Sequence, residues 1–181
     1  MLLKNKTILV LGGSGFIGSN IVEYFNKKNY KIFATYYKSK PRIFSNNIKW
    51  IKVNLLKESS IKKLFELSNY NFVIQCAAVT AGVETMKKDP FIFISGNAIM
   101  NSLLIKWSVH SKVDHFVFLS CTVMYNNSTI GLKEIDFDIK KKIHPSYEGI
   151  AYTKTYIESI CKFYSNNSRT KFTALRHSNI F

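Results

Sequence analysis

The fold of this chain is decided by the segment Ile8-Leu9-Val10-Leu11-Gly12-Gly13-Ser14-Gly15-Phe16-Ile17-Gly18-Ser19-Asn20. Its branched apolar residues are typical of a buried strand, and the apolar spacing that begins at Ile17 predicts an amphipathic helix. Glycines at positions 12, 15 and 18 follow the strand with a spacing of three residues. The segment therefore predicts a strand, a tight turn and a helix in direct succession.

The glycines of this turn suit the binding of a phosphate group. Backbone without a Cβ can turn sharply and approach a pyrophosphate, while free N–H groups and the positive end of the helix dipole face the anion. Glycines also occur in ordinary turns and helix caps, but the flanking strand and helix favour a dinucleotide site. The residues expected around the phosphates are Gly12, Ser14, Gly15, Phe16, Ile17 and Gly18.

The G-x-x-G-x-x-G spacing differs by one residue from the G-x-G-x-x-G fingerprint of dehydrogenases. It resembles the variant of the extended short-chain dehydrogenases/reductases, the NAD-dependent epimerase/dehydratase family that modifies sugar nucleotides. The resemblance implies a Rossmann-like α/β fold, a doubly wound parallel sheet of about six strands in the order 3-2-1-4-5-6. The dinucleotide is then expected at the C-terminal ends of the first and fourth strands.

Hydrophobic periodicity along the chain agrees with alternating strands and helices. The expected strands are Lys6–Leu11, Lys31–Tyr37, Trp50–Leu55, Asn71–Ala78, His115–Ser120 and Lys171–Arg176. The expected helices are Gly15–Lys28, Glu58–Leu67, a long one that opens at Pro90 and continues through Trp107, and Thr155–Tyr164. The segment Asn126–His144 is predicted to be the least ordered, with Lys140 to Lys142 as solvated charges.

Length and composition place the chain among globular proteins with one domain, residues 1–181. No apolar stretch approaches the roughly 20 residues that span a bilayer, and the N-terminus does not resemble a signal peptide. Cys76, Cys121 and Cys161 lack the spacing of a disulfide framework or a metal site. The sequence therefore predicts a cytoplasmic protein with free thiols, no metal and no membrane partner.

The formal charge of +15 raises the question of nucleic-acid binding. Of the 26 basic residues 23 are lysines spread over the whole chain, and three are arginines. Base readout and stacking favour arginine with interleaved aromatic residues, whereas scattered lysines are typical of a solvated surface. We therefore expect no nucleic-acid partner, although the same charge would attract the phosphates of a nucleotide.

The end of the second strand bears on the choice of cofactor. An acid at this point would bind a ribose 2′-hydroxyl, whereas basic residues suit a 2′-phosphate. The sequence has no acid there and carries Lys38 and Arg42, which favours NADP(H) over NAD(H). The alternative is that both are ordinary surface charges. By the family resemblance, Asn54 and Leu55 after the third strand are expected beside the adenine.

Two further segments carry the family resemblance near the fourth strand. Cys76-Ala77-Ala78-Val79-Thr80-Ala81-Gly82-Val83 resembles the Asn-Ala-Ala-Gly-like segment of the family, in which small residues let the backbone approach the cofactor. Simple packing of strand on helix is the alternative explanation for the two alanines. Asn97 lies where the family carries an asparagine that faces the cofactor. Ala77, Ala78, Val79 and Asn97 are therefore expected in the cofactor site.

The segment Phe116–Tyr125 resembles the Phe-x-Ser-Ser-x-x-Val-Tyr stretch of the family. There a Ser or Thr four residues before the tyrosine binds the substrate hydroxyl, and the matching residue of this chain is Cys121. A thiol is a poor hydrogen-bond donor, so Ser120 or Thr122 would have to serve instead.

The segment Pro145–Lys154 resembles the catalytic Tyr-x-x-x-Lys of the family, whose two residues lie one helical turn apart. Lys154 matches the lysine, which binds the ribose hydroxyls and lowers the tyrosine pKa. Ile150 stands at the tyrosine position and has no proton to give. Tyr152 is expected to point about 160° away from Lys154 around a helix, and Tyr147 is expected to precede the first turn.

Lys171–Phe181 resembles the Arg-Pro-x-Asn-x-Tyr-Gly segment that leads into the substrate-binding half of the family, with His177 at the proline position. We expect that substrate lobe to be absent from these 181 residues. The resemblance implies an NAD(P)-dependent epimerase, dehydratase or reductase that acts on a nucleotide sugar, closest to GDP-fucose synthase, and implies a homodimer. The alternative hypotheses are a catalytically impaired cofactor-binding fragment and a regulatory module that senses the NADP(H) redox state through a partner.

Overall fold

The computed structural model describes residues 6–80, 84, 88–126 and 128–180. Its strands are β1 (Thr7–Leu11), β2 (Lys31–Tyr36), β3 (Ile48–Lys52), β4 (Phe72–Gln75), β5 (His115–Cys121) and β6 (Lys171–His177). Its helices of two or more turns are α1 (Phe16–Lys27), α2 (Glu58–Glu66), α4 (Ser95–His110) and α5 (Glu148–Asn167). Short 3₁₀ turns are η1 (Pro90–Phe93), η2 (Thr122–Met124), η3 (Glu134–Asp136) and η4 (Pro145–Tyr147).

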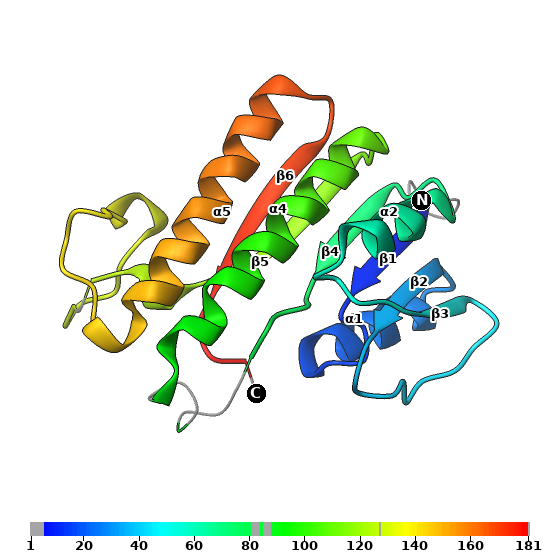
Figure 1. Ribbon diagram of the computed structural model, residues 1–181, viewed down its shortest axis with the longest axis horizontal. Helices are drawn as coiled ribbons and strands as arrows, with labels where there is room; N and C mark the ends of the chain where they lie inside the picture. Colours follow the sequence, from blue (N-terminus) through cyan, green and yellow to red (C-terminus); the bar gives the residue numbers. More distant parts are fainter. Residues whose placement is uncertain (1–5, 81–83, 85–87, 127, 181) are drawn as a thin grey trace.

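The strands that the described residues form make one parallel sheet in the order β3-β2-β1-β4-β5-β6, with helices on both faces (Figure 1). This is the predicted Rossmann-like topology. All five residues of β1 are buried, as expected for a central parallel strand that is covered on both faces. The order reverses between β1 and β4, and such a switch point is where open α/β sheets bind ligands.

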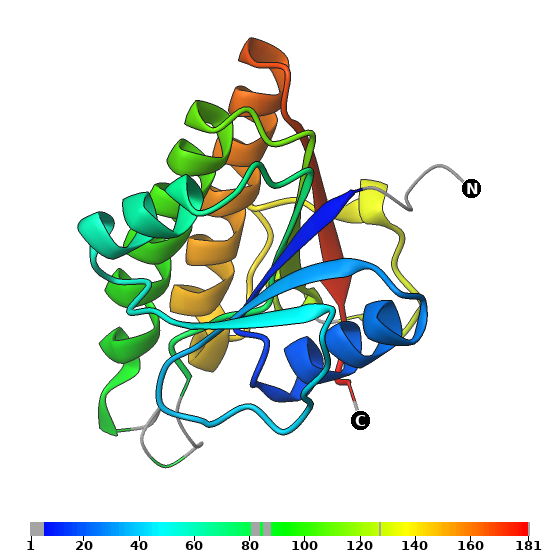
Figure 2. The same cartoon turned by 90° about the vertical axis from the view of Figure 1, so that its right-hand side faces the viewer.

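The two faces of the sheet are covered unequally (Figure 2). The main core lies under α2, α4 and α5 and includes Phe116, Phe118 and Leu104, each at most 2% exposed. On the opposite face α1 packs on β1 and β2 through Val22. Leu175 of β6, whose strand neighbour Ala174 joins the main core, is 47% exposed. The apolar surface of β6 is thus buried on the α5 side and open on the other.

Two strands end earlier than their apolar pattern predicts. The third strand is Ile48–Lys52 and not Trp50–Leu55, because the Asn54 side chain accepts from Leu56 N at 3.0 Å and starts a turn. The fourth strand stops at Gln75, whose side-chain amide binds the backbone of Ala77. In both places a polar side chain takes the backbone hydrogen bonds that a longer strand would have used.

The helices also differ from the periodic pattern at their starts. The long helix predicted from Pro90 opens with the 3₁₀ turn η1, capped by Asp89, and becomes α-helical at Ser95. The last helix begins at Glu148, seven residues before the predicted Thr155, so Ile150 and Lys154 both lie on it. Tyr147 precedes the first turn, as predicted. Within the described ranges, no helix has the length and apolar character needed to cross a bilayer.

Because the two faces of the sheet are covered unequally, we expect substitutions on β5 and β6 to differ in their effect on stability. Phe116→Ala empties a fully buried position and is expected to lower the free energy of unfolding by about 3–5 kcal/mol. Leu175→Ala removes a half-exposed side chain and is expected to lower it by less than about 1 kcal/mol. Urea unfolding followed by circular dichroism measures both. Similar losses in the two variants would show that another segment covers β6.

Candidate functional site

The glycine turn between β1 and α1 is closed by its own backbone. Gly15 N donates to Gly12 O at 3.0 Å, and Gly12 has a φ of +72°, which favours glycine. A Cβ on Gly12 would lie 2.7 Å from Ala77 Cα, and one on Gly18 would overlap Gly12 O. The turn therefore needs glycine at both positions, and it rests directly against the chain that follows β4.

The start of α1 offers unpaired N–H groups beside this turn. Gly15 caps the helix without a side chain, so the N–H groups of the first helical turn have no intrahelical acceptor. Gly15 and Phe16 are exposed, and Ser14 is half-buried. An anion such as a pyrophosphate suits this position, because the donors point along the helix axis and the capping residue Gly15 has no side chain.

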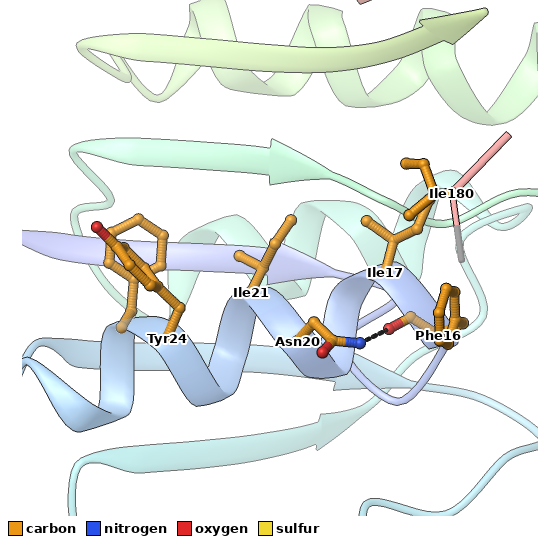
Figure 3. Close-up of a pocket in the computed structure, with 7 residues that line it drawn as sticks. Phe16, Ile17, Asn20, Ile21, Tyr24 and Ile180 are labelled. Carbon is orange, nitrogen blue, oxygen red and sulfur yellow. Dashed lines mark hydrogen bonds between the residues drawn. The ribbon is translucent and has the colours of Figure 1, made fainter. Parts of the chain in front are cut away.

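A groove of about 360 Å³ lies along α1, between this helix and Ile180, which follows β6 (Figure 3). The Asn20 amide donates to Phe16 O at 2.8 Å and is therefore used inside the helix. The groove shares Phe16 and Ile17 with the glycine turn, but its lining is mostly apolar and offers few polar groups to a phosphate. Its lining residues are Phe16, Ile17, Asn20, Ile21, Tyr24, Phe25 and Ile180.

The residues expected to choose the cofactor lie after β2 and β3. Lys38 and Arg42 are exposed and make no hydrogen bond or ion pair with other described residues. The Asn54 amide donates to Tyr37 Oη at 3.5 Å, which links the ends of the two strands. Leu55 is predicted beside the adenine, but its side chain belongs to the main core and is 9% exposed. Any contact of Leu55 with a cofactor would therefore involve its backbone.

Three side-chain amides form a network behind the end of β4. The Gln75 amide donates to Ala77 O at 3.0 Å and accepts from Ala77 N at 3.1 Å. It also donates to Asn101 Oδ1 at 3.0 Å, and Asn101 donates to Asn97 O at 2.8 Å. Gln75 is 2% exposed and Asn101 is 3% exposed. The network holds the chain after β4 in the position where it meets the glycine turn.

Sequence reasoning missed Gln75 and Asn101. Two signals were available: a glutamine in an otherwise apolar strand, and an asparagine one helical turn after Asn97 on a helix rich in apolar residues. A buried polar side chain is costly unless it is paired, so such residues mark places where the backbone needs support.

Asn97 contributes to the same support. Its Oδ1 accepts from Val79 N at 2.9 Å, and its amide donates to Val79 O at 3.0 Å and to Phe93 O at 2.7 Å. Both amide protons are used within the chain, so Asn97 supports the backbone of Val79, and its place in the cofactor site stays a prediction. Ala77 is half-buried and Ala78 is exposed. Residues 81–83, which also belong to the family-like segment, lie outside the described residues.

The structure brings Lys154 and Cys121 together at the C-terminal end of β5. Lys154 Nζ donates to Leu119 O at 2.6 Å and lies 4.5 Å from the centre of the Phe118 ring. Burial lowers the Lys154 pKa from its usual value, whereas the nearby Cys121 raises it. Burial raises the pKa of the Cys121 thiol, and Lys154 opposes that change. Lys154 is thus a largely enclosed ammonium group with a single hydrogen-bond acceptor among the described residues.

The two hydroxyl groups beside Cys121 have different surroundings. Ser120 is fully buried, and its Oγ donates to Met124 Sδ at 3.8 Å. Thr122 is exposed on η2. Because Ser120 is turned into the core, Thr122 is the hydroxyl that a ligand at this edge can reach.

The tyrosines near Lys154 do not replace Ile150. Tyr152 lies on α5 but is 51% exposed, and Tyr147 precedes the helix, with its ring centre 5.5 Å from that of His144. Cys76, Cys121 and Cys161 are free thiols, as predicted, and burial raises the pKa of Cys76 and of Cys161 to about 12. In the described part of the chain, no three His, Cys, Asp or Glu side chains are arranged to hold a metal ion.

Comparison with known proteins agrees with this geometry. Residues 8–181 match the model of the NAD dependent epimerase/dehydratase family. The chain is 23% identical to a dTDP-4-dehydro-6-deoxy-D-allose reductase from a Streptomyces species and 24% identical to a GDP-L-fucose synthase from Azorhizobium caulinodans. These matches cover 97% and 98% of the chain, and 56% and 53% of the relatives.

Solved structures show the same fold. The GDP-mannoheptose C4 reductase MlghC from Campylobacter jejuni, with NADP bound, superposes over 100% of this chain and 54% of its own with a TM-score of 0.83 at 20% identity. The UDP-glucose 4-epimerase from Thermus thermophilus, complexed with NAD, covers 94% of this chain and 54% of its own with a TM-score of 0.80 at 22% identity.

The glycine turn, the parallel sheet and the fold match define an α/β protein with a Rossmann-like fold. The chain belongs to the NAD-dependent epimerase/dehydratase family. It spans about half the length of the curated relatives that it matches.

The amide network makes a prediction about stability. Gln75→Leu leaves the Ala77 N–H group and the side-chain Oδ1 of Asn101 without these hydrogen-bond partners. We therefore expect the free energy of unfolding to fall by about 2 kcal/mol or more. Ser108→Ala is the matched control, because Ser108 Oγ is buried on α4 without a partner among the described residues, and its loss should change stability by less than about 0.5 kcal/mol. Urea unfolding measures both. Unchanged stability in Gln75→Leu would contradict the supporting role.

Proposed function

We propose that this chain binds NAD(P) at the turn from Gly12 to Gly18 and forms the cofactor-binding part of a nucleotide-sugar epimerase, dehydratase or reductase. The observation that carries the proposal is the contact of Gly12 with Ala77 after β4, beside the start of α1, which has no side-chain cap. Two neighbouring backbones and a helix N-terminus meet there at the switch point of the sheet. The names of the relatives supply the substrate class.

We infer a preference for NADP(H) from the end of β2. A 2′-phosphate needs a cation, and Lys38 and Arg42 are exposed there without partners among the described residues. A ribose 2′-hydroxyl is normally bound by an acid at this position, and the segment after β2 carries none before Arg42. The cofactor of solved relatives does not decide the choice, because one holds NADP and another NAD.

When bound, the nicotinamide would accept or supply the hydride in reactions of this class. The enclosed ammonium of Lys154 is suited to donate to ribose hydroxyls, and Thr122 offers a hydroxyl to a substrate. Ile150 occupies the position of the proton donor, and its side chain can neither give nor accept a proton. The chain therefore offers groups for the proposed binding of the cofactor but lacks the hydroxyl that the proposed proton transfer would need at position 150.

A second candidate function follows from Ile150. A family member without the tyrosine could bind the cofactor without turnover, as a catalytically impaired or regulatory module.

The resemblance further implies a homodimer through the helices that carry Asn97 and Lys154. Ile99 of α4 and Tyr152 and Tyr156 of α5 are 51%, 51% and 47% exposed, and such a dimer would bury them.

Calorimetric titration of the purified chain with NADPH and with NADH tests the binding proposal. We expect a micromolar dissociation constant for NADPH and at least about tenfold weaker binding of NADH. Gly18→Ala should abolish the heat of binding, because a Cβ there displaces Gly12 O, whereas Gly131→Ala, which adds a Cβ in open space, should leave it unchanged. A folded chain that binds neither cofactor would contradict the proposal. Equal affinities would contradict the assignment of Lys38 and Arg42.

Ile150→Tyr tests the catalytic candidates. In these 181 residues the variant is expected to bind NADPH like the wild type without turning over GDP- or dTDP-linked keto sugars, because the family resemblance puts substrate contacts beyond the matched region. The loss of NADPH absorbance measures turnover, with Ile150→Phe as the control for ring size. Turnover by Ile150→Tyr and none by Ile150→Phe would show that the chain needs the missing hydroxyl alone.

A further inference from the structure

Arg176, near the end of β6, joins four segments of the chain. Its guanidinium binds the Glu158 carboxylate of α5 in a bidentate manner, with Nη2 to Oε2 at 2.7 Å and Nε to Oε1 at 3.1 Å. Nη1 donates to Tyr125 Oη at 2.8 Å and to Glu134 O at 3.3 Å. The guanidinium also lies 4.6 Å from the centre of the Phe137 ring. Arg176 therefore uses donors of all three of its nitrogens and one face of its plane.

The Glu158 carboxylate depends on this arginine. Its side chain is 14% exposed, and Arg176 binds both of its oxygens. A carboxylate this deeply buried needs a cationic partner, since an unpaired buried charge is strongly unfavourable. Glu158 follows Lys154 by four residues on α5, so the two side chains leave the same face of the helix.

Lys154 is the alternative partner of Glu158. Its ammonium has Leu119 O and the Phe118 ring as neighbours, and no described carboxylate bonds to it. The charged or titratable groups that act on it are Cys121 from β5 and Glu158 from its own helix. A flexible lysine and a carboxylate one turn apart form an ion pair readily when neither has a better partner. Arg176 is that better partner for Glu158.

We propose that Arg176 is a positioning residue that holds Glu158 away from Lys154 and so keeps the Lys154 ammonium available to a ligand hydroxyl. This inference rests on the proposed cofactor function for its effect on binding, but not for its effect on Lys154 itself. The bidentate geometry matters, because it occupies both carboxylate oxygens at once. Arg176 acts on the site through Glu158 and does not touch the ligand.

Four variants separate this role from a purely structural one. Arg176→Met keeps the stem but releases Glu158 to Lys154, so NADPH affinity should fall by about tenfold or more, the contribution of a charge-assisted hydrogen bond. Glu158→Gln removes the competing charge and should leave the affinity within about twofold of the wild type. The double variant Arg176→Met/Glu158→Gln should recover that affinity. Arg176→Lys still pairs with Glu158 and should lie between the wild type and Arg176→Met.

Limited trypsin digestion reports the structural role separately. Arg176 also holds Tyr125, Glu134 and Phe137, so its loss should speed cleavage of the loop that carries Lys140 to Lys142. That cleavage should be as fast in the double variant as in Arg176→Met. Recovery of NADPH affinity in the double variant, while cleavage stays fast, would show that Glu158 and not loop order controls the site. Equal loss of affinity in both variants would overturn the proposal.

A second measurement does not need the cofactor. The NMR signal of the Lys154 ε-methylene group, assigned by its loss in Lys154→Arg, gives the pKa of the ammonium. We expect that pKa to rise in Arg176→Met, where Glu158 stabilises the charge, and to return in the double variant. If the wild type fails to bind NADPH, the proposed function fails, and this titration alone decides the role of Arg176. An unchanged pKa in Arg176→Met would overturn it.

Discussion

The approach of Gly12 to the backbone of Ala77 is the constraint on which the rest of the site depends. Side chains normally keep neighbouring loops apart, and here a single Cβ on Gly12 would lie 2.7 Å from Ala77 Cα. The close contact joins the ends of β1 and β4 at the point where the strand order reverses. It brings the start of α1 and the chain after β4 to one place, and so forms two walls of a site from elements 60 residues apart in the sequence.

Contact this close leaves the backbone after β4 without the hydrogen bonds of a regular strand. Buried N–H and C=O groups need partners, and the side chains of Gln75, Asn101 and Asn97 supply them. An amide side chain can donate and accept at once, so one residue satisfies both groups of Ala77 and another satisfies both groups of Val79. The segment that Gly12 contacts is therefore held by buried amide side chains from β4 and α4.

The order and the packing of the elements could be predicted from the sequence, because parallel strands that are buried on both faces leave continuous apolar runs. The ends of β3 and β4 could not, since Asn54 and Gln75 replace ladder hydrogen bonds with their own side chains. The glycine turn and Lys154 follow from local spacing. The ion pair of Glu158 and Arg176 joins residues that are 18 positions apart, one on a helix and one on a strand. The spacing of apolar residues within each element does not predict such a contact.

The proposed cofactor binding and the proposed proton transfer would use different atoms, and this chain offers more of those for binding. The proposed cofactor binding would use backbone N–H groups and one ammonium group, and the turn, the start of α1 and Lys154 offer both. The proton transfer that the family resemblance implies would need a hydroxyl at the position of Ile150, where this chain has none; Tyr152 and Tyr147 are both partly exposed. Burying a lysine ammonium group without an acidic partner is unfavourable unless other groups accept hydrogen bonds from it. The arrangement around Lys154, with Glu158 held by Arg176, leaves this ammonium group available to the hydroxyl groups of the proposed ligand.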